Sequence, residues 1–193
     1  MRLAVLASGN GSNFEVIAQA VKDKMIEAEL VLLFSDHHDA YVLERGKKFG
    51  ISCESFELKE FPDKKSYEAT LLELLNKYEV ELVVLAGYMR IIGKDLLDAF
   101  PNRIINIHPA LLPSFPGLHG IRDAYEAGVK ETGVTIHYVD SGVDTGPIIA
   151  QGKVQVAEED SLEDLEAKIH QVEHQLYPQV LAKIVKESNI KQD

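Results

Sequence analysis

Two polar side chains in an otherwise apolar segment, Asn106 and His108, are the residues of this sequence best placed to do chemistry. They belong to the stretch Arg103-Ile-Ile-Asn-Ile-His-Pro109, whose β-branched residues favour a strand. Alternate residues of a strand point to the same face, and a proline at the end places the imidazole where open α/β sheets bind ligands. An amide donor and an imidazole at one point suit a developing oxyanion and a proton in transit. Two polar residues packed beneath a loop for purely structural reasons would show the same spacing.

A second candidate site is the turn Ser8-Gly-Asn-Gly-Ser-Asn13, which joins an apolar run at 3–7 to residues with helical spacing. Backbone N–H groups at a helix N-terminus attract anions, and six small or polar residues exceed what a simple cap requires. The turn therefore predicts a phosphate site, with an ordinary Ser/Asn-capped turn as the alternative. A dinucleotide is disfavoured, because Phe14 stands where its fingerprint needs a small residue. The N–H groups that would face the phosphate belong to Gly11, Ser12 and Asn13.

Strands and helices are expected to alternate along the chain. Apolar runs predict strands at 3–7, 29–35, 51–56, 80–86, 103–109, 134–139 and 148–156. Helical spacing predicts helices from residue 14 and at 40–49, 63–77, 121–127 and 161–186, with Pro178 expected to kink or divide the last. This order predicts an α/β fold: a Rossmann-like, open, twisted and mostly parallel sheet with helices on both faces. Residues 1–193 are expected to form a single domain.

Composition narrows the class of protein. The chain has 193 residues, 46% of them hydrophobic, and a formal net charge of −11. That charge argues against a nucleic-acid partner, which requires a basic face, but leaves room for a small anionic ligand. The single cysteine, Cys53, fits a reducing compartment, and no apolar stretch is long enough to span a membrane. A cytoplasmic protein is expected, with its assembly open between a monomer and a homodimer.

The last predicted helix contains His170-Gln-Val-Glu-His174, the H-x-x-E-H spacing that supplies two zinc ligands in some metalloproteases. A hydrolytic zinc site needs a third protein ligand, and no acidic residue downstream suggests one. We therefore expect no metal, and a simpler interpretation uses Glu173 as an acceptor for a substrate amine. His37, His38 and Asp39 form another cluster, which is most simply a solvated turn.

Several motifs occur in an order that is specific in combination. They are Ser8–Asn13, Gly87-Tyr-Met-Arg90, Asn106-Ile-His-Pro-Ala-Leu-Leu-Pro113, Pro116-Gly117 and Asp144-Thr-Gly-Pro147. Together they closely resemble the phosphoribosylglycinamide formyltransferase family, the folate-dependent formyltransferases of purine synthesis. The resemblance extends from Leu3 to about Pro178.

The resemblance implies that a formyl group passes from 10-formyltetrahydrofolate to the amine of glycinamide ribonucleotide. It implies that catalysis rests on Asn106, His108 and Asp144. The implied ribonucleotide ligands are Gly11, Ser12 and Asn13 for the phosphate and Glu173 for the amine. The implied folate pocket comprises Lys64, Met89, Arg90, Ile91, Ile92, Asn106, Asp140 and Val143. Lys64 (or Lys65) stands where some relatives have an arginine near the folate glutamate tail.

In this chemistry the amine attacks the formyl carbonyl directly, so no serine or cysteine nucleophile is needed. Asn106 and protonated His108 are expected to donate hydrogen bonds to the oxyanion, and Asp144 beside His108 favours the charged imidazole. The nearest alternative is a 10-formyltetrahydrofolate hydrolase, in which water replaces the amine. A third reading is a non-catalytic folate- or nucleotide-binding protein.

Overall fold

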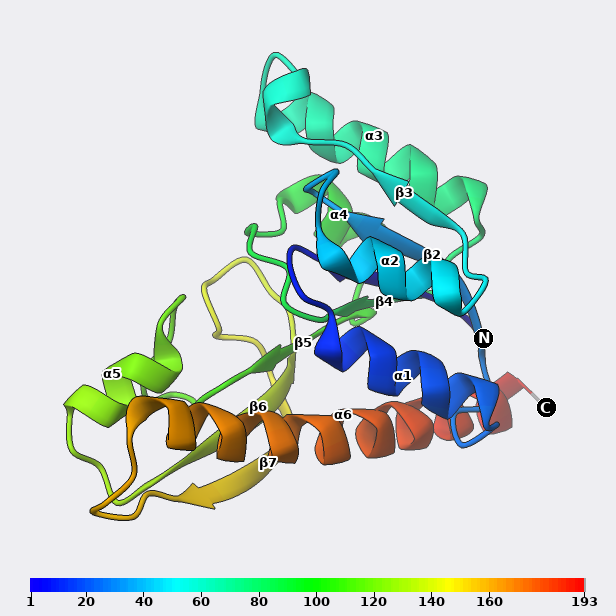
Figure 1. The fold of residues 1–193 in the computed structure, drawn as a ribbon. Helices are drawn as coiled ribbons and strands as arrows, with labels where there is room; N and C mark the ends of the chain where they lie inside the picture. The colour runs from blue at the N-terminus through cyan, green and yellow to red at the C-terminus, as the bar shows by residue number, and fades with distance from the viewer. Residues whose placement is uncertain (193) are drawn as a thin grey trace.

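The computed structural model describes residues 1–192, and seven strands form one sheet across the molecule (Figure 1). The strand order is β3-β2-β1-β4-β5-β6-β7, parallel from β3 to β5 and antiparallel from β5 to β7. The predicted open, mostly parallel sheet is confirmed. The strands are β1 (Arg2–Ala7), β2 (Glu29–Ser35), β3 (Cys53–Ser55), β4 (Leu82–Leu85), β5 (Ile104–His108), β6 (Glu131–Tyr138) and β7 (Ile148–Gln155).

Helices cover both faces of the sheet, as the alternating pattern predicts. One core cluster joins α1, α2 and α6 to side chains of one sheet face, and a second joins α3 and α4 to the other face. The central strands are buried on both sides, which explains why they are almost continuously apolar. The helices are α1 (Ser12–Lys22), α2 (Tyr41–Lys48), η1 (Leu58–Glu60), α3 (Lys64–Lys77), α4 (Lys94–Ala99), α5 (Gly120–Glu126) and α6 (Leu162–Gln192).

The structure differs from the sequence prediction at four elements. The strand expected at 51–56 is limited to β3, and the short helices η1 and α4 were not predicted. The expectation that Pro178 would divide the last helix is wrong, because α6 continues through it to Gln192. An internal proline costs about 3 kcal/mol. The row of α6 side chains buried in the core offsets this cost, and it includes Leu165, Ile169, Tyr177, Leu181 and Val185.

The sheet brings the predicted site segments together. β1, β4 and β5 are adjacent and parallel, so their carboxyl ends lie at one edge. The glycine turn follows β1, the loop Gly87–Ile92 follows β4, and His108 ends β5. Within residues 1–192, none of the helices combines the length and the apolar character needed to cross a bilayer.

Candidate active site

The carboxyl end of β5 carries Asn106 and His108, and the loop between β6 and β7 brings Asp144 to them. An Asp144 carboxylate oxygen lies 3.5 Å from His108 Nδ1. The backbone N–H of Gly117 donates to the same oxygen at 2.8 Å, which fixes the carboxylate. His108 is 3% exposed, so its interaction with Asp144 is shielded from bulk water. The structure thus brings the three predicted catalytic side chains into one cluster.

The hydrogen bonds of His108 define which ring nitrogen carries a proton. Nε2 lies 2.7 Å from the carbonyl oxygen of Phe115. A carbonyl only accepts, so Nε2 must donate, and Nδ1 carries no hydrogen in the neutral ring. Nδ1 is the atom that faces Asp144. The Phe115 carbonyl therefore fixes the ring orientation and leaves the Nδ1 edge beside the carboxylate.

His137 is part of the same cluster, and sequence reasoning missed it. In the antiparallel pair of β5 and β6 it stands opposite Asn106, and the amide nitrogen of Asn106 lies 3.3 Å from its Nε2. His137 Nδ1 lies 2.9 Å from the carbonyl oxygen of Tyr138, so Nδ1 donates and Nε2 accepts from Asn106. One Asn106 N–H is thereby used, and the other stays available to a ligand. The sequence contains one signal for His137, its alternation with Thr135 along a predicted strand. The strand register that pairs His137 with Asn106 depends on tertiary structure, so the sequence alone does not reveal it.

The glycine turn begins α1 without a side-chain cap. Gly11 is the N-cap residue, in the left-handed region at φ 80°, and no side-chain hydrogen bond caps the helix. The alternative of a simple Ser/Asn cap is therefore wrong. From α2, Arg45 holds the turn, because its guanidinium donates to the backbone and side-chain oxygens of Asn10 at 2.8 and 2.7 Å. The first N–H groups of α1 remain directed at the space in front of the turn.

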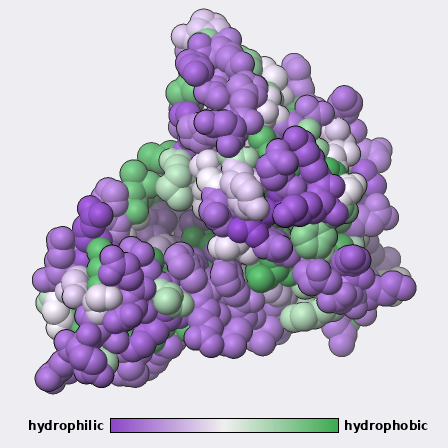
Figure 2. Space-filling model, in the orientation of Figure 1, coloured by the Kyte–Doolittle hydropathy of each residue, from purple (hydrophilic) through white to green (hydrophobic). Residues whose placement is uncertain are grey.

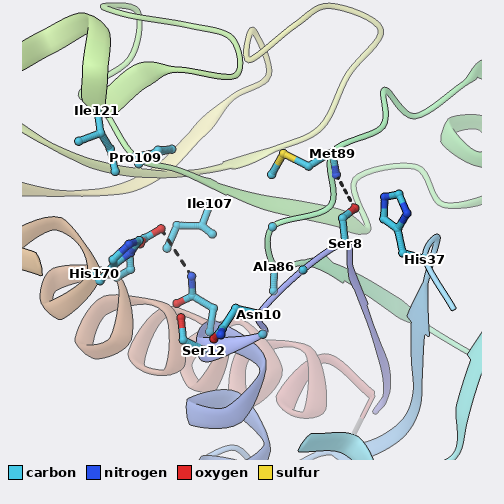
Figure 3. Close-up of a pocket in the computed structure, with 15 residues that line it drawn as sticks. Ser8, Asn10, Ser12, His37, Ala86, Met89, Ile107, Pro109, Ile121 and His170 are labelled. Carbon is cyan, nitrogen blue, oxygen red and sulfur yellow. Dashed lines mark hydrogen bonds and ion pairs between the residues drawn. The ribbon is translucent and has the colours of Figure 1, made fainter. Parts of the chain in front are cut away.

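That space is a cavity of about 430 Å³ bounded by the turn, the ends of β4 and β5, and α6 (Figure 3). Glu173 of α6 lines it and is 5% exposed. Its carboxylate lies 2.7 Å from His170 Nδ1 and 3.5 Å from the amide nitrogen of Asn13. The bond to Glu173 raises the pKa of His170, while burial lowers the pKa of His174, whose Nε2 lies 3.1 Å from Ser12 Oγ. The predicted ribonucleotide ligands thus line one cavity.

A second cavity, of about 310 Å³, lies on the other side of the same wall. Apolar side chains surround its mouth, among them Met89, Ile91, Leu118 and Val143, each more than half exposed. In the space-filling view the surface is hollowed between the parts carrying α5 and α4, with hydrophobic side chains beside the hollow (Figure 2). A flat, largely apolar ligand suits such a site. All of the predicted folate residues except Lys64 line this cavity, together with the catalytic trio.

The two cavities meet at the catalytic cluster. Gly87, Met89, Ile107 and Pro109 line both of them. Ile107 lies between Asn106 and His108 on β5, so the strand end forms the boundary. A group carried by a ligand in one cavity can therefore reach a ligand in the other beside the amide, the imidazole and the carboxylate.

Comparison with known proteins identifies the family. The family model described as "Formyl transferase" matches residues 1–181. A phosphoribosylglycinamide formyltransferase from Bacillus subtilis (strain 168) is 48% identical over 184 residues, which cover 95% of this chain and 94% of that protein. The chain belongs to the phosphoribosylglycinamide formyltransferase family. The resemblance inferred from the motifs is confirmed.

Solved structures of family members share the whole fold. The phosphoribosylglycinamide formyltransferase from Bacillus halodurans aligns with a TM-score of 0.95 at 49% identity, over 97% of each chain. That from Streptococcus pneumoniae TIGR4 aligns with a TM-score of 0.89 at 54% identity, over 95% of this chain and 98% of the other. The chain is therefore a formyl-transferring enzyme with a Rossmann-like sheet.

Lys64 lies apart from the second cavity of this formyltransferase, where the other predicted folate residues lie. It lines a third cavity of about 330 Å³ with Lys65 and Lys94, beyond the loop that follows Ile92. Its ammonium group lies 3.6 Å from Glu68, whose carboxylate accepts the backbone N–H of Gly93. The predicted contact of Lys64 with a folate tail stays a prediction, because a ligand would have to extend past Ile92 to reach it.

The two histidines of the H-x-x-E-H spacing in α6 make separate contacts, and the expectation of no metal stays a prediction. His170 turns to Glu173 and His174 to Ser12, so the two imidazoles engage different partners. Among residues 1–192, a compact group of potential ligands is formed by His37 and Asp39, from the turn that the sequence predicts to be solvated, and Glu57, the N-cap residue of η1; all three are at least partly exposed.

Proposed function

We propose that the chain transfers the formyl group of 10-formyltetrahydrofolate to the amine of glycinamide ribonucleotide in purine biosynthesis. The observation that carries the proposal is the position of Asn106, His108 and Asp144 where the two cavities meet. Family membership supports the reaction class, since the relatives are named for this transfer. 10-Formyltetrahydrofolate is the co-substrate, and no metal takes part.

In this proposal the glycine turn and Glu173 place the amine. The phosphate binds the uncapped N–H groups of Gly11, Ser12 and Asn13, where the helix dipole favours an anion. Glu173 accepts a hydrogen bond from the glycinamide amine with the carboxylate that lines the cavity. With the phosphate at one end and the amine at the other, the nitrogen points at the shared wall.

On the folate side, Asn106 acts on the formyl carbonyl, while His108 and Asp144 act on the proton of the attacking amine. The amine nitrogen forms a bond to the formyl carbon, and the carbonyl oxygen becomes an oxyanion facing the free N–H of Asn106. His108 Nδ1 takes the proton that the attacking nitrogen releases, and Asp144 stabilises the imidazolium. When the bond from the formyl carbon to the folate nitrogen breaks, His108 returns the proton to that nitrogen. Atoms and charge balance, and no covalent enzyme intermediate forms.

The proposal extends to the organisation of the chain. Residues 1–193 act as a single formyltransferase domain, which the single seven-stranded sheet of the described residues supports. The partners are the two small-molecule substrates, with neither nucleic acid nor membrane required, and a homodimer is compatible with this arrangement. The net charge of −11 and the single cysteine fit a cytoplasmic enzyme.

Purified protein incubated with 10-formyltetrahydrofolate, with and without glycinamide ribonucleotide, tests the proposal. Tetrahydrofolate release and formylation of the ribonucleotide are both measured. Equal amounts of both products, formed only when the ribonucleotide is present, are expected. Tetrahydrofolate release without the amine would instead identify a hydrolase, and binding of either ligand without turnover would identify a sequestering protein.

A further inference from the structure

Asp36 is a buried carboxylate next to both cavities that the reaction described so far does not use. It follows β2 directly and its side chain is 1% exposed. Arg90 Nε donates to Asp36 Oδ2 at 2.8 Å. The other oxygen, Oδ1, is buried and has no hydrogen-bond partner among residues 1–192. Arg90 therefore supplies the main compensation for this charge.

A buried ion pair of this kind is a poor way to gain stability. Desolvation of the two charges consumes most of their attraction, so an apolar pair of similar size often stabilises a fold equally well. What the pair does provide is orientation, because Nε of a planar guanidinium fixes the plane of the whole group. Arg90 is also stacked near Tyr67 of α3, with its guanidinium carbon 5.6 Å from the ring centre. Its side chain is thus held at two points.

Asp36 and Arg90 follow strands that are not adjacent in the sheet, and Arg90 belongs to the loop Gly87–Ile92. Asp36 follows β2 and Arg90 follows β4, and β1 lies between these strands. Ser8, after β1, holds the backbone of the same loop, since its N–H donates to Gly87 and its hydroxyl accepts from Met89. The backbone is therefore already fixed by Ser8, and Asp36 adds control of the Arg90 side chain.

Arg90 is the one lysine or arginine among the residues that line the folate cavity. With Nε bonded to Asp36, both Nη groups are left for a ligand. The co-substrate of the proposed reaction is an acid, with the carboxylates of a glutamate tail. A guanidinium whose plane is fixed binds a carboxylate better than a guanidinium that rotates freely, because it loses less rotamer entropy on binding.

We propose that Asp36 is a positioning residue for the formyl-folate, acting through Arg90; this rests on the proposed function. The distances predict that its effect is selective. Asp36 lies within hydrogen-bond distance of Arg90, which lines the folate cavity, but 3.7 Å from Nε2 of His37, which lines the ribonucleotide cavity. Loss of the carboxylate therefore weakens folate binding and leaves ribonucleotide binding intact.

Asp36→Asn tests the proposal, because it keeps the volume and removes the charge. We expect the Kd of 10-formyltetrahydrofolate, measured calorimetrically without ribonucleotide, to rise about tenfold, as for loss of a charge-assisted hydrogen bond. The Kd of glycinamide ribonucleotide and kcat at saturation stay within about twofold of wild type. Asp39→Asn, an exposed carboxylate in the same turn, is the matched control and leaves both constants unchanged. A folate Kd equal to wild type, or equal losses for both ligands, overturns the proposal.

A double variant shows whether Asp36 acts through Arg90. In an Arg90→Gln background, Asp36→Asn should change the folate Kd by less than about twofold, because the group it positions is gone. A further tenfold loss would mean that Asp36 acts by another route. If Asp36→Asn is recovered only in unfolded form, Asp36→Ser, which also removes the carboxylate, is measured with the same expected outcome of a higher folate Kd and an unchanged ribonucleotide Kd. Turnover by wild type tests the proposed function separately, so failure of either idea is distinguishable.

Discussion

Replacing Gly11 by alanine probes how the backbone builds the anion site. Gly11 has φ 80°, which L side chains rarely adopt. A Cβ added there would lie 2.2 Å from Val42 Cγ2, 2.6 Å from Val42 Cβ and 3.0 Å from its backbone Cα. Val42 is fully buried, β-branched and bonded through its N–H to the Gly9 carbonyl at 3.0 Å, so it cannot move aside freely.

Two costs follow if the turn keeps its shape. The left-handed conformation costs about 1–2 kcal/mol for a residue with a Cβ. Crowding in a well-packed region costs a further ~1–3 kcal/mol. The total loss in the free energy of unfolding is then about 2–5 kcal/mol. If the turn moves instead, stability recovers but the N–H groups of Ser12 and Asn13 leave the phosphate. Either stability or ribonucleotide binding must suffer.

Urea unfolding followed by circular dichroism and the Kd of glycinamide ribonucleotide measure both outcomes. Gly9→Ala is the control, because nothing lies within 4 Å of a Cβ at Gly9. It should cost less than about 0.5 kcal/mol, as for a substitution without a specific mechanism. In a Val42→Ala background, Gly11→Ala should cost only the conformational part, about 1–2 kcal/mol. Wild-type stability combined with wild-type ribonucleotide affinity in Gly11→Ala would refute this account of the turn.

Three further substitutions test other parts of the structure. Asn106→Ala should lower kcat at least about 100-fold, as for loss of an oxyanion donor, while the protein still folds, as judged by an unchanged circular dichroism spectrum; a kcat within threefold or so would contradict its role. His170 has a pKa raised by its bond to Glu173, so the stability it adds is complete below its ordinary value of 6.5 and is lost as pH rises through the raised value. Urea titrations across this pH range should show that loss in wild type and not in His170→Gln. Tyr177→Phe removes a buried hydroxyl that donates to the Leu85 carbonyl at 2.8 Å, and the free energy of unfolding should fall by about 1 kcal/mol; no change would mean that the bond contributes nothing.

The features predicted from the sequence are those with local causes. Continuous apolar runs mark the central strands, because both sheet faces are covered. The spacing of Asn106 and His108 is a property of any strand, and the turn at Ser8–Asn13 has few other uses between a strand and a helix. These signals place the two candidate site segments at the same sheet edge without knowledge of any tertiary contact.

The features that were missed depend on contacts between distant residues. His137 joins the site because the antiparallel register sets it opposite Asn106, and no local pattern encodes that register. The orientation of His108 depends on the carbonyl of Phe115, which any residue type would provide. The continuity of α6 through Pro178 reflects burial along its length, which overrides the local preference of proline.

The negative net charge of the chain bears on how the Gly11 turn and the Arg90–Asp36 pair would contribute to the binding of anionic ligands. Both proposed ligands are anionic, yet the chain has a net charge of −11, and no lysine or arginine of residues 1–192 lines the proposed ribonucleotide cavity. At physiological salt the Debye length is about 8 Å, so carboxylates on distant surfaces are largely screened while donors in contact with a ligand are not. In the proposed function, binding then depends on a few oriented groups, namely the N–H groups of the Gly11 turn in one cavity and Arg90 in the other. We therefore expect the φ of Gly11 and the bond from Arg90 to Asp36 to have more influence on affinity than the net charge.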